Sequence, residues 1–226
     1  KIKGRYTIFG KNPDKIWEFN NNNSYLIKNK KKIKLKEKPQ VLIENIIEDF
    51  KFKIPSGLPS ISSLISGYFS YDAIRYIENI PNNCKDDLKV PDVRLLRPRT
   101  LIIHDNLKKK IFYIINIFKD EKIVNYSRKY LEIKSELSIL SSQSSRKSLV
   151  KFNTNKIVNI KVKSNTSKNK FLNIVNKAKK YIKIGDIFQV VLSQRFEAKL
   201  TKSPLEIYKK LRTTNPSPFM FFFNFN

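Results

Sequence analysis

The chain has 226 residues, 40% of them hydrophobic, so it is long and apolar enough to bury a core as one large domain or two small ones. Its net charge of +27 suggests nucleic-acid binding. Only 9 of the 46 basic residues are arginine, however, and arginine is the residue that hydrogen-bonds bases and binds phosphate through two N–H groups. We therefore interpret the charge as mostly solvated surface. A single cysteine, Cys84, excludes an intramolecular disulfide, and no stretch approaches the roughly 20 apolar residues of a membrane helix, so a cytoplasmic protein with no membrane partner is expected.

The first fifty residues predict three antiparallel strands followed by a helix. The strands are rich in β-branched and aromatic residues and cover Arg5–Gly10, Lys15–Asn20 and Ser24–Asn29. Turn-forming residues separate them at Asn12-Pro13-Asp14 and Asn21-Asn22-Asn23. The lysine run Lys28–Lys38 then predicts a charged loop or the edge of a sheet, and isoleucines at helical spacing predict a short helix over Pro39–Phe50.

The middle of the chain predicts a strand, a short helix and a hairpin. Leu64–Tyr71 is predicted as a strand in which Gly67 marks a bulge or a close approach of two backbones. Asp72 is positioned to cap a helix that ends before Pro81. The polar stretch Asn82–Arg97 is predicted to be irregular, with its aspartates in a solvated loop. The strands Arg99–His104 and Lys110–Phe118 flank Asp105–Lys108 and predict a β-hairpin.

A helix with one apolar stripe is predicted over Glu121–Leu140. The stripe consists of Ile123, Tyr126, Tyr130, Ile133, Leu137 and Leu140. It predicts packing against the chain's own sheet; the alternative, a partner helix, would be favoured by a longer heptad pattern. Because residues rich in Ser, Asn and Lys follow, we predict an N-terminal domain over residues 1–140, a linker over 141–167 and a second domain over 168–226.

The last sixty residues carry the clearest pattern. A helical stripe beginning at Phe171 ends at Gly185, a residue suited to the left-handed position after a helix. Asp186–Ala198 is predicted as a strand, because its apolar residues are mostly β-branched or aromatic. Ser203, followed by a proline and then by Glu206, gives the start signal of a second helix with a capping box.

That second helix is predicted to bury Leu205, Tyr208 and Leu211 and to end at Asn215-Pro216-Ser217-Pro218, since two prolines fix φ and remove donors. The segment Phe219–Phe225 is almost wholly apolar and is predicted as a strand. An uncovered strand of this kind favours aggregation, so we expect the sequence to be a piece of a longer protein.

Few residues are suited to catalysis by type alone. His104 is the only histidine, and without further ligands it does not fit the common zinc sets, so we interpret it as structural. Cys84 lies in a polar loop with no histidine nearby, which disfavours a catalytic thiolate. The five glycines form neither a phosphate-binding loop nor a dinucleotide fingerprint. The residue types by themselves therefore indicate an α+β protein without a defined activity.

Longer motifs carry a stronger signal. They are Gly4–Gly10 (GRYTIFG) with Pro13-Asp14, Gly67–Asp72 (GYFSYD), Arg75–Glu78 (RYIE), Leu88–Asp92, Lys179–Glu197 (KKYIKIGDIFQVVLSQRFE), Ser203–Tyr208 and Asn215–Phe222 (NPSPFMFF). In this order they resemble the anthranilate synthase component I family, over nearly the whole chain apart from the lysine-rich loop and the linker. The resemblance implies an α+β fold of antiparallel sheets with flanking helices, in which the second domain is incomplete.

The resemblance also implies a reaction and its partners. Members of the family convert chorismate and ammonia into anthranilate and pyruvate, the first step of tryptophan biosynthesis. They use Mg²⁺, receive ammonia from a glutamine amidotransferase subunit and are inhibited by L-tryptophan. Their metal ligands and most chorismate contacts lie beyond the matched motifs, so we expect no metal ligand in this chain and no activity from it alone.

Gln189 is the informative residue within the predicted strand. Relatives that add water to chorismate resemble this strand but carry a lysine just before the Val-Val-Leu-Ser stretch, where it acts as a base on water. A neutral amide does not deprotonate water but can hydrogen-bond an amine. Gln189 therefore favours an ammonia-using enzyme, with this side chain on the amine side of chorismate. Anthranilate synthase and aminodeoxychorismate synthase component I both remain open.

The segment Asn215–Met220 resembles a wall of the family's tryptophan site and favours anthranilate synthase. Two prolines make a stiff surface, and Phe219 and Met220 are suited to flank an indole ring. The inhibitor contacts that the resemblance implies are Asn215, Pro218, Phe219 and Met220, with Arg5 and Tyr6 in the same cleft. A Glu-Ser segment that the family's site also uses would precede Lys1.

Two hypotheses of other kinds remain. A non-catalytic regulatory or partner-binding remnant predicts a monodisperse protein of this length. A basic nucleic-acid binder predicts an affinity that falls steeply with salt, and the scarcity of arginine argues against it.

Overall fold

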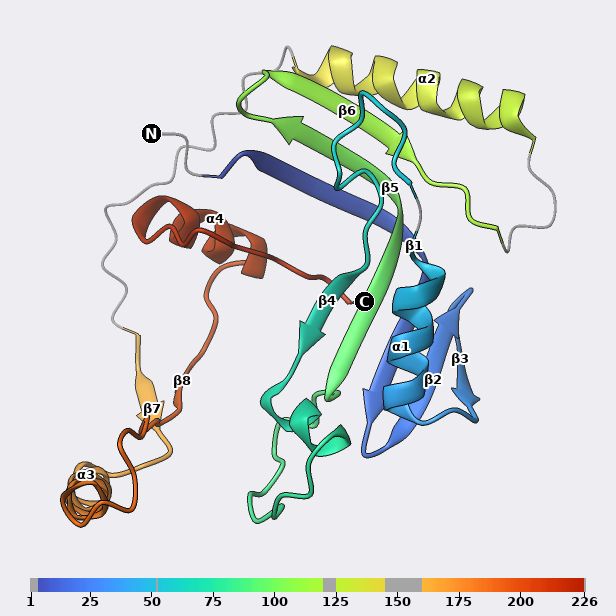
Figure 1. The fold of residues 1–226 in the computed structure, drawn as a ribbon. Helices are drawn as coiled ribbons and strands as arrows, with labels where there is room; N and C mark the ends of the chain where they lie inside the picture. The colour runs from blue at the N-terminus through green and yellow to red at the C-terminus, as the bar shows by residue number, and fades with distance from the viewer. Residues whose placement is uncertain (1–3, 52, 120–124, 145–159, 226) are drawn as a thin grey trace. The chain divides into compact units, whose positions relative to one another are not determined.

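Two compact units make up the chain. The computed structural model describes residues 4–51, 53–119, 125–144 and 160–225 (Figure 1). The larger unit comprises residues 1–147 and 223–226, and the smaller unit comprises residues 148–222. Ile123 and most of the predicted linker lie outside the described residues. In the described ranges, none of the helices is long and apolar enough to cross a bilayer.

An antiparallel sheet is the frame of the larger unit. Its strands within the described residues are β1 (Tyr6–Asn20), β2 (Asn23–Lys28), β3 (Lys31–Leu35), β4 (Ser66–Phe69), β5 (Val93–Asp105) and β6 (Lys110–Ile115). The order is β3-β2-β1-β5-β4. Strand β4 pairs with the first part of β5, and β6 pairs with the second part of the same strand. The β1–β5 ladder extends from Tyr6 opposite Asp105 to Phe19 opposite Val93. The predicted α+β class with antiparallel strands and flanking helices is confirmed.

Two tight hairpins join β1 to β2 and β2 to β3. Asn21 and Asn22 have φ of 47° and 62°, and Asn29 and Lys30 have φ of 50° and 63°. Left-handed backbone at both central residues gives the primed turns whose twist matches that of the strands. The turn predicted near Asn21 is confirmed. The predicted sheet edge is also confirmed, because β3 is the outermost strand on its side.

A bulge in β1 replaces the turn predicted at Asn12-Pro13-Asp14. The register with β5 shifts between Pro13 and Lys15, and β1 continues as one strand. Proline has no N–H to give to the ladder, so a bulge is a position at which a strand tolerates it. On β5, Arg97 donates to both carboxylate oxygens of Asp14, with its Nε 2.9 Å from Oδ1, which holds the bulged segment against its neighbour. The predicted turn is wrong because pairing with β5 keeps the chain extended.

The predicted helix over Pro39–Phe50 is confirmed as α1 (Pro39–Asp49), which packs on one face of the sheet. Its Ile46 is buried with Trp17 and Phe19 of β1 and Val93 and Leu95 of β5. Burying each such side chain stabilises the fold by about 1.5–3 kcal/mol, so this cluster is the hydrophobic core of the larger unit.

Strand β4 approaches β5 at Gly67. A Cβ placed on Gly67 would lie 2.0 Å from the carbonyl oxygen of Arg94, so only glycine fits, and the predicted close approach is confirmed. The residues after β4 form a 3₁₀ helix, Tyr71–Tyr76, whose N-cap Ser70 makes no side-chain cap. The predicted cap by Asp72 is wrong, because its carboxylate accepts from Arg75 Nε at 2.8 Å instead.

The hairpin of β5 and β6 is confirmed, but β5 begins at Val93, within the stretch predicted to be irregular. Helix α2 (Tyr126–Ser144) runs along β6 (Figure 1). It touches the sheet through Glu136, which accepts from Lys11 Nζ at 2.5 Å and from the Tyr113 hydroxyl. Three stripe residues, Tyr126, Tyr130 and Leu137, are exposed, so the predicted packing of the stripe on the sheet is wrong.

The smaller unit consists of short, well-capped elements. They are β7 (Val162–Ser164), paired with β8 (Phe196–Ala198), α3 (Lys168–Lys183) and α4 (Pro204–Thr214). After α3, Gly185 has φ of 84° and donates its N–H to Ile182 O, and Asp186 donates to Tyr181 O, which completes a Schellman motif. The predicted capping box of Ser203 and Glu206 at the start of α4 is confirmed.

Other predictions for this part of the chain are wrong. Only Phe196–Ala198 of the predicted strand Asp186–Ala198 is paired, since β7 offers three partner residues. Leu205 and Leu211 of α4 are exposed, and no α4 residue is buried. Phe219–Phe225 forms no strand. The strand and the buried face of α4 need a neighbouring strand or surface, which the described part of the smaller unit does not supply. Phe223–Phe225 belong to the larger unit, where the Phe225 ring meets the Tyr68 ring edge-on with 5.9 Å between centroids, without joining the sheet.

Replacement of Gly67 by alanine tests the strand contact. We expect Gly67→Ala to destabilise the larger unit by about 3 kcal/mol or more, because the clash is with backbone, which cannot rotate away. Gly57→Ala is the control: it meets open space at φ of 88° and should cost about 1 kcal/mol for the left-handed backbone. Urea unfolding followed by the fluorescence of Trp17, the single tryptophan, measures both; equal losses would contradict the close approach.

Candidate functional site

Arg5 and Tyr6, two of the predicted inhibitor contacts, lie together at the start of β1. The Arg5 guanidinium donates to Asp105 Oδ2 from Nε at 3.3 Å and from Nη2 at 3.1 Å. It also lies over the Tyr6 ring, 4.8 Å from the centroid. Tyr6 and Asp105 are directly opposite in the β1–β5 ladder, which explains why these three side chains meet.

Asp105 is the buried centre of this group. Its Oδ1 accepts from the backbone N–H groups of Leu107 at 2.9 Å and Lys108 at 3.0 Å, which closes the turn of the β5–β6 hairpin. Burial by itself raises the pKa of the carboxyl, but the hydrogen bonds from Lys108, Arg5 and Leu107 outweigh it, so the pKa lies below the ordinary 3.8. The hydrogen bond to Asp105 raises the pKa of Arg5. Both groups are therefore charged at neutral pH.

A cavity of about 220 Å³ adjoins this ion pair. Its lining residues are Arg5, Tyr6, Gly57, Leu58, Pro59, Ser60, Asp105, Lys108 and Phe112. Two of the lining residues, Arg5 and Lys108, are cations, and two others, Tyr6 and Phe112, are aromatic. This volume is below the usual range of small-molecule sites, so the cavity suits a small polar ligand or one end of a larger one.

The other predicted inhibitor contacts lie in the smaller unit. Asn215 is the C-cap of α4, and its N–H donates to Leu211 O at 2.9 Å. Pro218 and Phe219 are exposed, and the carbonyl of Met220 accepts from the Tyr208 hydroxyl at 3.4 Å. The segment follows α4 without regular structure, and the two groups of predicted contacts belong to different units.

Gln189 also lies in the smaller unit. It is exposed in an irregular segment between α3 and β8, and its neighbours Phe188 and Val191 are exposed as well. The predicted strand around it is wrong, as described above. Its predicted role toward an amine stays a prediction.

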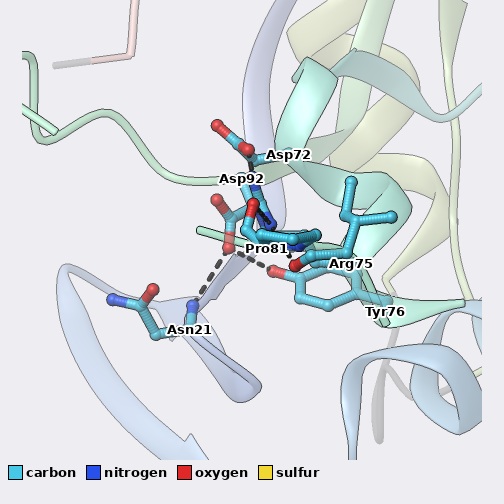
Figure 2. Close-up of polar contacts among 7 residues, drawn as sticks. Asn21, Asp72, Arg75, Tyr76, Pro81 and Asp92 are labelled. Atoms are coloured by element: carbon cyan, nitrogen blue, oxygen red, sulfur yellow. Dashed lines mark hydrogen bonds and ion pairs between the residues drawn. The ribbon is translucent and has the colours of Figure 1, made fainter. Parts of the chain in front are cut away.

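Asp92 organises a polar centre that sequence reasoning missed (Figure 2). Its Oδ2 accepts from the Tyr76 hydroxyl at 2.8 Å and from the Asn21 N–H at 3.0 Å, and its carbonyl accepts from the Ser70 N–H at 2.7 Å. Burial and the bond to Asp92 raise the pKa of the Tyr76 hydroxyl, so it stays a donor at any physiological pH. The prediction of Asp92 as a solvated loop residue is wrong: it ties the β1–β2 turn to the segment after β4.

Arg75 completes this polar centre. Its Nη1 donates to the carbonyls of Ile80 at 2.7 Å and Pro81 at 3.0 Å (Figure 2). These bonds order the start of a loop that has no regular structure. The spacing of Asp72 and Arg75, three residues apart, was the only local signal in the sequence. It could not reveal that Asp92 binds the distant Asn21.

Within the ranges that the structure describes, no three His, Cys, Asp or Glu side chains lie together to hold an ion. Among the described residues there is therefore no set of donors that fits a bound Mg²⁺.

Lowering the pH tests the Arg5–Asp105 pair. Because the pKa of Asp105 is depressed on folding, its carboxylate stabilises the fold above the unfolded pKa, and this contribution is lost as the pH falls through the folded pKa. Asp105→Asn should therefore lower the urea midpoint at pH 7, and the difference from wild type should shrink as the pH drops below about 4.

The control is Asp72→Asn, which removes an exposed ion pair and should change the midpoint little at any pH. A pH-independent difference between Asp105→Asn and wild type would contradict the charged pair.

The chain is similar to proteins of known family. A family model described as "chorismate binding enzyme" matches residues 5–226. Proteins named "Anthranilate synthase component 1" from Acetivibrio thermocellus and Cereibacter sphaeroides are 34% and 30% identical, over 98% and 100% of this chain. The chain spans 46% of the length of each.

A solved structure gives the same result for the fold. Anthranilate synthase component I from Streptococcus pneumoniae superposes with a TM-score of 0.78 at 26% identity. The match covers 100% of this chain and 49% of that chain.

Proposed function

The chain belongs to the family of chorismate-binding enzymes, and on that basis we propose that it forms part of the large subunit of an anthranilate synthase. The proposed reaction converts chorismate and ammonia into anthranilate and pyruvate. The observation that carries the proposal is the match of 98% of this chain to a relative of that name. Because the chain spans about half the length of its relatives, residues 1–226 are proposed to contribute to the reaction without completing it.

The proposed enzyme works with partners. A protein named component 1 implies a second component, and a glutamine amidotransferase subunit that supplies ammonia fits that role. L-tryptophan is the proposed feedback inhibitor, Mg²⁺ the proposed cofactor and the cytoplasm the proposed location. No described residue is assigned to the metal.

Gln189 is proposed to lie on the amine side of chorismate. Ammonia carries its own lone pair and needs no base to become nucleophilic, whereas water does. The Gln189 amide can accept from the amine and donate to the substrate, and it stays neutral throughout. The exposure of this side chain within its own unit leaves it accessible to a ligand.

A chimera tests the reaction. Residues 1–226 would replace the matching segment of the Acetivibrio thermocellus relative, and the purified protein would receive chorismate and ammonium. We expect fluorescent anthranilate and an equal amount of pyruvate. Gln189→Lys should lower the ammonia-dependent rate about 100-fold, the usual scale for a misplaced acid–base group.

The matched control for that substitution is Gln40→Lys, at an exposed position of α1. Aminodeoxychorismate without anthranilate would favour the alternative enzyme, and isochorismate would contradict an ammonia-using one. Residues 1–226 alone should give no product.

Inhibition of the same chimera tests the Asn215–Met220 segment. Pro218→Ala and Met220→Ala should each raise the tryptophan concentration for half-inhibition about tenfold, because a stiff turn or a ring contact is lost. Thr213→Ala, on the neighbouring helix turn, should leave it unchanged. Unchanged inhibition in both test variants would contradict the proposed site.

A further inference from the structure

Helix α2 carries an apolar seam that the described residues of the larger unit leave largely exposed. The α2 seam consists of Tyr126, Tyr130, Ile133 and Leu137, which recur four, three and four residues apart, the spacing of a coiled-coil contact. Tyr126 is 71% exposed, Tyr130 64% and Leu137 43%, and Ile133 is half-buried. Glu136, which binds Lys11 and Tyr113 of the sheet, lies roughly a quarter turn round the helix from the seam.

A pair of opposite charges flanks one side of this seam. Lys129 and Glu136 are seven residues apart and so lie on the same helix face. Glu136 binds Lys11 and Tyr113 through Oε2 alone, and its Oε1 accepts no hydrogen bond among the described residues. The seam is thus bordered by one cation and by one carboxylate with an acceptor to spare.

We propose that the α2 seam binds the α2 seam of a second copy of this chain, with the two helices antiparallel. In that arrangement Lys129 of each copy faces Glu136 of the other, so a twofold axis creates two ion pairs. A parallel pair would instead place Lys129 beside Lys134 of the second helix, and like charges would repel. The charges therefore select a self-complementary, antiparallel contact.

The same register fills the seam with matched side chains. Tyr126 packs against Leu137 of the second copy, and Tyr130 packs against its Ile133, so each layer combines a large ring with an aliphatic group. Aromatic anchors of this kind supply most of the free energy in protein interfaces.

The overall charge works against this dimer. Each chain carries +27, so two copies repel at low salt, and the association depends on the apolar seam. Salt screens the repulsion, so the dimer should tighten as ionic strength rises. Binding of a polyanion to the lysine-rich surface would show the opposite trend.

Sedimentation analysis of the 226-residue chain tests the proposal. We expect a reversible monomer–dimer equilibrium whose Kd falls between about 0.15 M and about 0.5 M salt. Leu137→Glu should raise the Kd at least about tenfold. Leu131→Glu, at a 63% exposed position on the other side of α2, should not.

Two variants with the same change of charge test the register of the antiparallel helices. Lys129→Glu and Arg128→Glu change the net charge equally, and both residues contact Glu132, at 2.9 Å and 3.5 Å. Only Lys129→Glu places like charges across the twofold axis, so only it should raise the Kd, by about fivefold.

Circular dichroism would confirm that each variant keeps its helix content. A monomer at every concentration, a Kd that rises with salt, or equal effects of the seam variants and their controls would overturn the proposal.

Discussion

Pairing between β1 and β5 supports the rest of the larger unit. The two strands are hydrogen-bonded along nearly their whole length, and the remaining strands attach to one of them directly or through β2. The hydrophobic core grows from the same ladder, since Trp17 lies opposite Leu95 and Phe19 opposite Val93. The Arg5–Asp105 pair closes one end of the ladder, and the Asp14–Arg97 pair fixes its bulge. Loss of this pairing would remove the core, the cavity and the attachment of α2 together.

The smaller unit is held in a different way. Its helices are fixed at their ends by local groups, the Ser203–Glu206 box on α4 and the Gly185 turn after α3, and not by a core of its own. Ala178 is the buried hydrophobic residue among those described there. Large apolar groups such as Phe188 and Phe219 remain exposed. Since the relatives are about twice as long as this chain, the family fold includes elements beyond the ones described.

The proposed function rests on family membership and on a few placed residues. Arg5 and Tyr6 could be nominated from the sequence only through a motif resemblance, and their partner Asp105 could not, because it lies a hundred residues away along the chain. Asp92 shows the same limit: its bonds to Tyr76 and Asn21 depend on folding of the sheet. The contact of Glu136 with Lys11 and Tyr113 was not predicted either. The apolar stripe of α2 predicted that a different side of the helix would face the sheet.

Local patterns in the sequence determined the Gly185 turn after α3, the capping box of α4, the asparagine hairpin turn, most helix positions, the close approach at Gly67 and the family resemblance. These features depend on backbone preferences and on neighbours within a few residues, which the order of residues specifies directly. Only the tertiary structure decided that Asn12-Pro13-Asp14 bulges and does not turn, that Val93–Arg97 is strand, that Asp186–Arg195 is not, and that the α2 seam faces outward. The physical reason is that strand formation and burial require a second surface, and the position of that surface is set by the whole fold.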